Sequence, residues 1–256
     1  SISRADFWAL FASIVVQEAA SLPTSVSFAY GRKDNVDCSA GAGRLPGAQF
    51  GLEEVLGVFE ERMGLTLTET VALIGAHSLG HVHPEVSGYG VNPNDIVLDP
   101  VQKEDELEFL LNAWDITPDV LDNEYFIELT DKGWKNGASP FLNGATQDSS
   151  DSSKSQWRHL KNPLVMLHAD MAIAYPISPL PPPTQGQKQV CGPRTIRDPR
   201  GIGSYGCRQP NDFTPPAPWT TSLAFAQDNA LFLTTFAAAF TKMTQTGYVG
   251  GGAGRV

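Results

Sequence analysis

Apolar residues recur at helical spacing near the start of the chain, between residues 3 and 20. Ser3 and Asp6 stand where a helix-capping pair would stand, bonded to the free backbone N–H groups of a first turn. The apolar positions that follow make one stripe, which predicts an ordinary helix packed into a core. The members of this stripe are Phe7, Leu10, Phe11, Ile14 and Val15.

Three further segments repeat this period. Residues 51–63 predict an amphipathic helix with Leu52, Val55, Leu56, Phe59 and Met63 facing inward. Residues 66–80 predict a helix that opens with Thr66 and Glu69 as a capping box and ends near Gly80, because Pro84 prevents continuation. Its inward positions are Val71, Ile74 and Ser78, with His77 on the same face. Residues 224–247 predict a long amphipathic helix.

The segments between these helices lack a period. Residues 89–113 carry a turn-like run at 92–95 and five acidic residues between Asp99 and Glu108, which indicates a solvated acidic insertion. Residues 135–156 are polar and rich in Ser and Asp, so a mobile loop is expected. Residues 176–218 are dense in Pro and Gly and are expected to be irregular or extended. No internal repeat is visible, so the pattern predicts a mainly α-helical fold.

Composition narrows the classes of function. The net charge of −10 over 256 residues argues against nucleic acid and anionic membranes as partners. It would suit a cationic protein partner, with plain solubility as the alternative. No apolar run approaches the roughly 18 residues of a membrane span. Cys191 and Cys207 could form a disulfide, with Cys38 remaining as a third cysteine. This cysteine content does not decide the redox compartment of the protein.

His77 would mean little alone, because a histidine on an apolar face is more often a core residue than a ligand. Residues 71–80, however, read Val-Ala-Leu-Ile-Gly-Ala-His-Ser-Leu-Gly, and 83–85 read His-Pro-Glu before Ser87-Gly88. This text resembles the proximal helix of the plant, fungal and bacterial haem peroxidase superfamily. The resemblance implies that His77 binds the iron of haem b. It also implies that His81 and His83 lie at the haem propionates and that Ser87 belongs to the cofactor contacts.

Two more segments extend the resemblance. Residues 166–172, Met-Leu-His-Ala-Asp-Met-Ala, resemble the segment whose carboxylate bonds to the distant ring N–H of the ligating histidine, which gives Asp170 that role. By itself, Asp170 would be read as a helix N-terminal cap. Trp114 resembles the tryptophan that ascorbate and cytochrome c peroxidases place under the haem, bonded to the same carboxylate. The plain alternative is a buried aromatic residue.

A third part of the resemblance concerns a metal ion. The secreted fungal branch has a proximal calcium site, and five residues of this sequence resemble it in order and in local spacing. Carboxylates, hydroxyls and a backbone carbonyl make an all-oxygen site, and Asp115 favours Ca²⁺ over the K⁺ of many ascorbate peroxidases. Asp115 and Thr117 could also simply form a turn before Pro118. The implied ligands are Ser78, Asp115, Thr117, Val120 and Asp122.

The sequence also departs from these relatives. Val86 stands where ascorbate peroxidases have an arginine that helps bind ascorbate, which counts against ascorbate as the electron donor. In the superfamily the distal histidine and arginine lie upstream of a helix like 3–20, and here only Ser1 and Ile2 precede it. We therefore expect a haem-peroxidase-like domain over residues 1–256 without its N-terminal distal helices, with insertions at 89–113 and 179–215. The start at Ser1 without Met indicates processing or truncation, which would suit an organellar or secreted protein.

Two main hypotheses follow for function. The first is a haem peroxidase that reduces hydrogen peroxide and oxidises an unknown donor by single electrons, impaired in this chain unless the distal half is supplied. The second is a non-catalytic subunit of a larger assembly, in which a protein partner covers the apolar side of helix 3–20. A third hypothesis, zinc held by His77 and His81 at i, i+4 spacing, lacks a third ligand.

Overall fold

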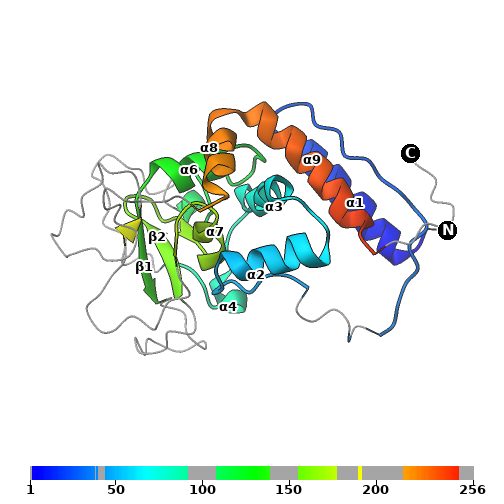
Figure 1. The fold of residues 1–256 in the computed structure, drawn as a ribbon, viewed down its shortest axis with the longest axis horizontal. Helices are drawn as coiled ribbons and strands as arrows, with labels where there is room; N and C mark the ends of the chain where they lie inside the picture. The colour runs from blue at the N-terminus through cyan, green and yellow to red at the C-terminus, as the bar shows by residue number, and fades with distance from the viewer. Residues whose placement is uncertain are drawn as a thin grey trace.

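The computed structural model describes residues 2–37, 39, 44–91, 108–138, 155–177, 190–191 and 216–247. Helices dominate it, and a small sheet lies at the opposite end of the molecule from α1 and α9 (Figure 1). The mainly α-helical class predicted from the sequence is therefore confirmed. The helices are α1 Arg4–Ala19, α2 Leu52–Leu56, α3 Leu67–Ile74, α4 Pro84–Ser87, α6 Glu124–Asp131, α7 His168–Ala172, α8 Trp219–Gln227 and α9 Asn229–Gln245.

A four-stranded antiparallel sheet runs in the order β3-β2-β1-β4. Its strands are β1 Trp134–Ala138, β2 Ser155–His159, β3 Val165–Met166 and β4 Val190–Cys191. The mobile loop expected over 135–156 is therefore wrong at both ends, while 139–154 lie outside the described residues. Strand β1 reads Trp-Lys-Asn-Gly-Ala, which has little β-propensity, so its conformation comes from long-range pairing such as Trp134 with His159.

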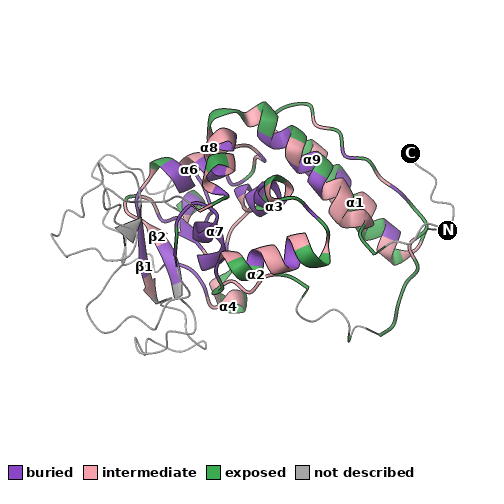
Figure 2. Cartoon of the chain, in the orientation of Figure 1, coloured by how far each residue is buried: buried purple, intermediate pink, exposed green. Residues whose placement is uncertain are grey.

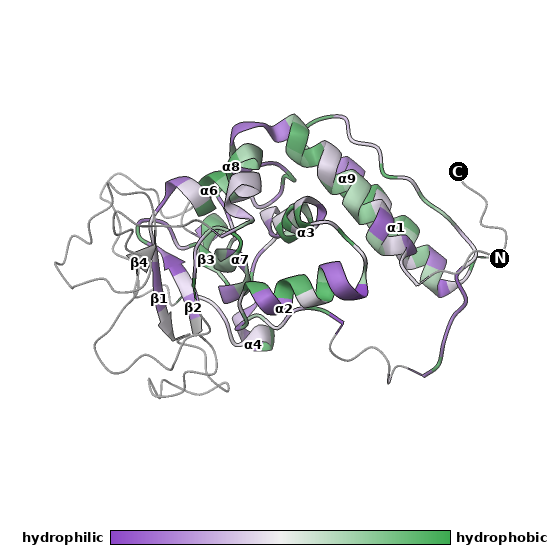
Figure 3. Cartoon of the chain, viewed as in Figure 1, coloured by the Kyte–Doolittle hydropathy of each residue, from purple (hydrophilic) through white to green (hydrophobic). Residues whose placement is uncertain are grey.

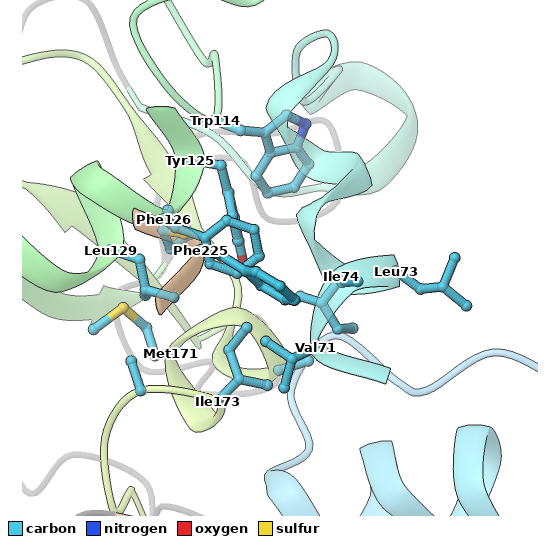
Figure 4. Close-up of a cluster of buried hydrophobic side chains, with 14 of the residues drawn as sticks. Val71, Leu73, Ile74, Trp114, Tyr125, Phe126, Leu129, Met171, Ile173 and Phe225 are labelled. Carbon is cyan, nitrogen blue, oxygen red and sulfur yellow. The ribbon is translucent and has the colours of Figure 1, made fainter. Parts of the chain in front are cut away.

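Aromatic side chains fill the core where α3, α6, α8 and α9 meet. Helix α3 packs against α9, and α6 packs against α8. Phe126 lies at the centre, with its ring 5.2 Å from that of Phe225 and 5.1 Å from that of Phe232 (Figure 4). A Cβ atom on Gly75 would lie 2.7 Å from Phe126 and 2.8 Å from Phe232, so this position has no room for a side chain.

Helix α1 differs from the rest of the molecule. Its bounds match the prediction, but its apolar stripe is not a core stripe, because Phe7, Trp8 and Phe11 are 48%, 63% and 52% exposed. Figure 2 shows buried residues gathered in α3, α7 and the sheet, and exposed ones along α1. The prediction of an ordinary core helix is wrong, because no described segment packs over this face.

The segment 51–63 forms α2 followed by a π-helical turn, η2, over Gly57–Arg62. Val55 and Phe59 are buried as predicted, and Val58 joins them, because a π-turn holds more residues than an α-turn. The single helix expected over 224–247 is broken between α8 and α9. Asp228 has an extended backbone there, and its carboxylate accepts from Leu231 N–H to cap α9.

The described ends of the segment 89–113 are only partly solvated: residues 89–91 and 112–113 are buried, whereas Glu108 and Phe109 are exposed. Gly90 donates to the side chain of Gln156, and Val91 donates to the side chain of Asn112, which has a left-handed backbone. Most of the acidic run and residues 192–215 lie outside the described residues, as do Cys38 and Cys207. Within the described part of the chain, no helix has the length and apolar character needed to cross a bilayer.

Candidate functional site

The start of α3 fixes the helix that leads to His77. Thr66 Oγ1 accepts from Glu69 N–H at 3.2 Å, and Glu69 Oε2 accepts from Thr66 N–H at 2.7 Å, so the predicted capping box is present. Lys242 from α9 donates to the same carboxylate at 2.8 Å. The helix does not reach Gly80 in α-form. It ends at Ile74 and tightens into a 3₁₀ turn, η3, over Gly75–Ser78, which carries His77.

His77 faces a buried carboxylate. Its Nδ1 lies 2.7 Å from Oδ1 of Asp170, a residue more than ninety positions later in the chain. Burial lowers the pKa of His77, but the charge and hydrogen bond of Asp170 outweigh it, so the net shift is upward. The side chain is 36% exposed, and Nε2 has no hydrogen bond within the described part of the chain. This histidine is oriented through one ring nitrogen and keeps the other available.

Asp170 accepts three hydrogen bonds while fully buried. Oδ1 receives His77 Nδ1 and, at 2.8 Å, the hydroxyl of Tyr125 from α6. Oδ2 receives the backbone N–H of Leu167 at 2.7 Å, at the start of α7. Asp170 is therefore both the helix cap and the partner of the histidine, so the two sequence interpretations hold together.

Trp114 lies flat against His77. The two ring centroids are 4.0 Å apart, and the ring planes differ by 3°. The expected bond from Trp114 to Asp170 is absent from the described hydrogen bonds, and Tyr125 donates to that carboxylate instead. Tyr125 was not among the predicted site residues. A tyrosine on the inward face of the segment after Trp114 was the available signal, since a buried hydroxyl needs a partner.

The five oxygen-bearing residues of the predicted cation site lie together. Ser78 Oγ donates to Asp115 Oδ2 at 2.8 Å and also reaches the Val120 carbonyl at 3.2 Å. Thr117 donates from its backbone to Asp115 at 2.9 Å and from its hydroxyl to Asp122 at 3.1 Å. These bonds join the end of η3 to the loop after Trp114. The expected turn at 115–117 is therefore present as part of the cluster.

Negative charge accumulates in this cluster. Burial raises the pKa of Asp115 to about 7, and the charges of Asp122 and Glu124 act in the same direction against the bonds from Ser78 and Thr117. A buried carboxylate of this kind is the donor chemistry that a cation would stabilise. Among the described residues, no group of three or more His, Cys, Asp or Glu side chains is placed to hold a metal ion.

The remaining predicted contacts surround the turn after η3. His81 Nε2 lies 2.8 Å from the Phe109 carbonyl, and the His81 backbone bridges to Ala113. His83 is the residue before α4, and Ser87 donates to its carbonyl at 2.9 Å. Val86 is 85% exposed.

The premise of a zinc pair at His77 and His81 is wrong. The α-helix ends at Ile74, so the two histidines do not share an α-helical face. Their bonded ring nitrogens face Asp170 and the Phe109 carbonyl, which lie on different segments.

Comparison with known proteins shows the family to which the chain belongs. A model of the family described as Peroxidase matches residues 1–181, and the chain therefore belongs to the peroxidase family. Its relatives include a mitochondrial cytochrome c peroxidase of Aspergillus fumigatus, 34% identical over 173 residues. That match covers 67% of this chain and 38% of the relative.

Other relatives are an ascorbate peroxidase and a further cytochrome c peroxidase. L-ascorbate peroxidase 3 of Arabidopsis thaliana is 37% identical over 128 residues, which are 50% of this chain and 36% of the relative. A mitochondrial cytochrome c peroxidase of Neurospora crassa is 30% identical over 174 residues, covering 67% and 38% of the two chains. The chain spans less than half the length of these relatives.

Proposed function

We propose that this protein is a haem peroxidase, with haem b bound through Nε2 of His77. The observation that carries the proposal is the pairing of His77 Nδ1 with buried Asp170 while Nε2 stays available. A metal-ligating histidine typically donates its other N–H to a carboxylate, which fixes its tautomer and raises its basicity. The flat contact of Trp114 with His77 also supports the proposal, although the bond from Trp114 to Asp170 that the resemblance implied is absent among the described residues.

Each residue of the site has its own role in the proposed activity. Haem, when bound, supplies the reduction of hydrogen peroxide and the one-electron oxidation of a donor. Asp170 holds the Nδ1 proton of His77 and makes the imidazole electron-rich. Trp114 is proposed to hold an oxidising equivalent, stabilised by the buried negative charge of Asp170. His81, His83 and Ser87 follow the ligand turn directly and are proposed to contact the propionates.

The test is haem reconstitution of the wild type and of His77→Gly. The wild type should take up haem stoichiometrically and show a Soret band, whereas His77→Gly should lose it. Added imidazole can enter the space left by the side chain and should restore the band. A His77→Gly protein that keeps the unchanged spectrum without imidazole contradicts the assignment.

We also propose that Ca²⁺ binds to Ser78, Asp115, Thr117, Val120 and Asp122. The support is the closely bonded oxygen cluster and the raised pKa of Asp115, which a cation would reverse. Calcium takes six to eight oxygen ligands, and two carboxylates favour it over K⁺. A cation here would tie η3, and with it His77, to the loop after Trp114.

The identity of the electron donor is a further part of the proposal. Exposed Val86 offers no positive charge, so an anionic electron donor such as ascorbate is not expected at this position.

The rate of reaction with peroxide is a further part of the proposal, because proton transfer between peroxide oxygens needs a general acid–base. His159 Nδ1 accepts two backbone N–H groups and His168 Nδ1 accepts from Trp157, so neither is available. The 256-residue chain tested alone should therefore react slowly with peroxide in stopped-flow mixing, and a fast stoichiometric reaction contradicts this.

A second function rests on the exposed face of α1. Phe7, Trp8 and Phe11 form one aromatic surface, with rings 5.5 Å to 6.3 Å apart. Contiguous exposed apolar surface of this kind marks contact with another segment or chain. The alternative proposal is therefore a non-catalytic subunit whose α1 surface is covered by a protein partner. Full haem loading with normal peroxide turnover would overturn this alternative.

A further inference from the structure

The hydroxyl of Tyr125 and the ring of His77 compete for one oxygen atom. Both donate to Oδ1 of Asp170, at 2.8 Å and 2.7 Å. The other oxygen, Oδ2, is already bonded to Leu167 N–H. The carboxylate is fully buried, and these three groups are its hydrogen-bond donors within the described part of the chain.

Tyr125 is fixed in this position. It lies on α6, is fully buried, and its ring meets that of Phe126 edge-on at 5.0 Å (Figure 4). Its ring also meets that of His77 edge-on at 6.5 Å. Burial and the charge of Asp170 raise the pKa of Tyr125 well above its usual value, so the phenol keeps its proton and acts as a donor.

A carboxylate oxygen that accepts two short bonds attracts each donor less than one that accepts a single bond. Hydrogen bonds to an ionised acceptor are the strong ones, so a second donor withdraws an appreciable part of the charge available to the first. Within the described residues, Tyr125 is the one side chain besides His77 that donates to Oδ1.

We propose that Tyr125 is a positioning residue whose hydrogen bond to Oδ1 of Asp170 weakens the hydrogen bond between Asp170 and the Nδ1 proton of His77. By weakening that bond, Tyr125 limits the anionic character of the imidazole. This inference rests on the proposed function for its effect on an iron, but the hydrogen-bond competition itself does not need haem. If His77 holds haem iron, an imidazole with more anionic character would stabilise ferric over ferrous iron, so Tyr125 would keep the reduction potential higher than Asp170 alone would.

The first measurement uses the protein without haem and detects the His77 Nδ1 proton by ¹⁵N-histidine NMR. Tyr125→Phe should move this proton downfield, because the His77–Asp170 bond shortens when Oδ1 loses its second donor. The matched control is Tyr175→Phe, which also removes a buried phenol but one bonded to the Leu129 carbonyl at 3.0 Å. The control should leave the proton in place.

The second measurement uses haem-loaded protein and follows the ferric–ferrous potential by spectroelectrochemistry. Tyr125→Phe should lower the potential and raise the frequency of the iron–histidine stretch, and Tyr175→Phe should do neither. An NMR shift without any haem uptake would uphold the hydrogen-bond competition and reject the proposed function. Haem uptake with an unmoved Nδ1 proton in Tyr125→Phe would reject the inference and leave the proposed function intact.

A third variant covers the case in which Tyr125→Phe fails to fold. Biosynthetic replacement of tyrosine by 3-fluorotyrosine gives a stronger donor of nearly the same size. The Nδ1 proton of His77 should then move upfield, opposite to the direction expected for Tyr125→Phe, and should do so equally in a Tyr175→Phe background. A downfield or absent shift would overturn the inference.

Discussion

The site around His77 and the helix α1 both bury polar side chains, but the aromatic side chains Trp114 and Tyr125 are buried beside His77, whereas those of α1 are exposed. Around His77, polar groups are buried and each is bonded, as with Asp170 and its three donors. On α1, polar Asp6 and Ser13 are buried while the aromatic stripe is exposed. Figure 3 shows hydrophobic residues on α1, and Figure 2 shows exposed residues along the same helix. The exposed apolar residues are Phe7, Trp8, Phe11, Ile14 and Val15.

The buried side of α1 is held by charge as well as by apolar packing, because Val16 belongs to the hydrophobic core. Arg32 donates to Asp6 at 2.9 Å, and the backbone N–H groups of Gly31 and Arg32 donate to the same carboxylate. Although burial opposes it, these bonds keep the pKa of Asp6 below its usual range. The difference between the regions teaches that an apolar stripe predicts a helix reliably, but its burial depends on a covering segment.

The largest effect should come from removing the acceptor at the centre of the His77 site. Asp170→Ala leaves three donors without their acceptor: the fully buried Tyr125 hydroxyl and the partly buried His77 Nδ1 and Leu167 N–H. Each buried unsatisfied group costs about 1–3 kcal/mol, so a loss of about 3 kcal/mol in the free energy of unfolding is expected. Chemical denaturation measures it. Asp34→Ala is the matched control, because Asp34 also accepts backbone N–H groups, those of Arg4 and Ala5, but at the exposed start of α1. Equal losses in the two variants would remove the contrast between the regions.

Calcium should give the next largest effect. A ligand that binds only the folded state stabilises it by about 2.7 kcal/mol at one hundred times its dissociation constant. Added Ca²⁺ should therefore raise the melting temperature of chelator-treated protein, and Asp122→Asn should abolish the rise. Asp131→Asn, at an exposed position of the neighbouring helix α6, is the control that should keep it. An equal rise with K⁺ at the same concentration would identify K⁺ as the bound cation instead.

A third region contains a buried carboxylate with fewer hydrogen bonds than Asp170 among the described residues, and its effect on stability should depend on pH. Glu128 on α6 lies 3.3 Å from Nε2 of His159, and both are buried. Burial raises the pKa of Glu128 to about 7 and lowers that of His159 to about 4. The charged neighbours facing this pair are Lys132, Glu124, Asp115 and Asp131 for Glu128, and Lys132 and Lys161 for His159.

The sign of the pH effect follows from these shifts. Glu128 holds a proton in the folded state up to pH about 7 but loses it near 4.5 when unfolded, so its contribution to stability falls as pH rises through this window. His159 opposes this only below about pH 6.5, where the unfolded chain binds the proton. Between pH 6 and 8, Glu128 should cost the protein about 1–2 kcal/mol.

The variant Glu128→Gln isolates this effect. It keeps an acceptor for His159 Nε2 and removes the titration, so it should lose less stability than the wild type between pH 6 and 8. Urea denaturation at pH 6, 7 and 8 measures the difference. Parallel pH profiles for the two proteins would mean that Glu128 stays ionised throughout this range.

Much of the His77 site could be predicted because its parts are local. The capping box at Thr66 and the turn that carries His77 each lie within a few residues, and the segment around Asp170 is short and specific. The five oxygen-bearing residues were expected because they resemble the cation site of the secreted fungal branch. The pairing of His77 with Asp170, ninety-three positions apart, was likewise expected from the resemblance. Tyr125 was missed because the resemblance assigned it no role and its contact with Asp170 appears only in the fold.

The errors in the fold have the same origin. Strand β1 contains Lys135 and Asn136, whose burial depends on pairing with β2 rather than on their own propensity. The break at Asp228 was hidden because the apolar pattern continues on both sides of it. The exposure of Trp8 could not be read from the stripe, because a helical pattern names the apolar face but not what covers it.

The smallest effect should come from the exposed aromatic surface of α1, which Phe7, Trp8 and Phe11 form. Trp8→Gln with Phe11→Gln removes two large apolar side chains, yet both are more than half exposed, so the free energy of unfolding should change by no more than about 0.5 kcal/mol. The control is Phe126→Ala in the aromatic core, where about 3–5 kcal/mol should be lost. Self-association of the protein, followed by sedimentation, should fall in the α1 double variant, because fewer apolar groups face water. A loss above 2 kcal/mol in this variant would show that the stripe is covered in solution, and α1 would then join the His77 region as buried structure.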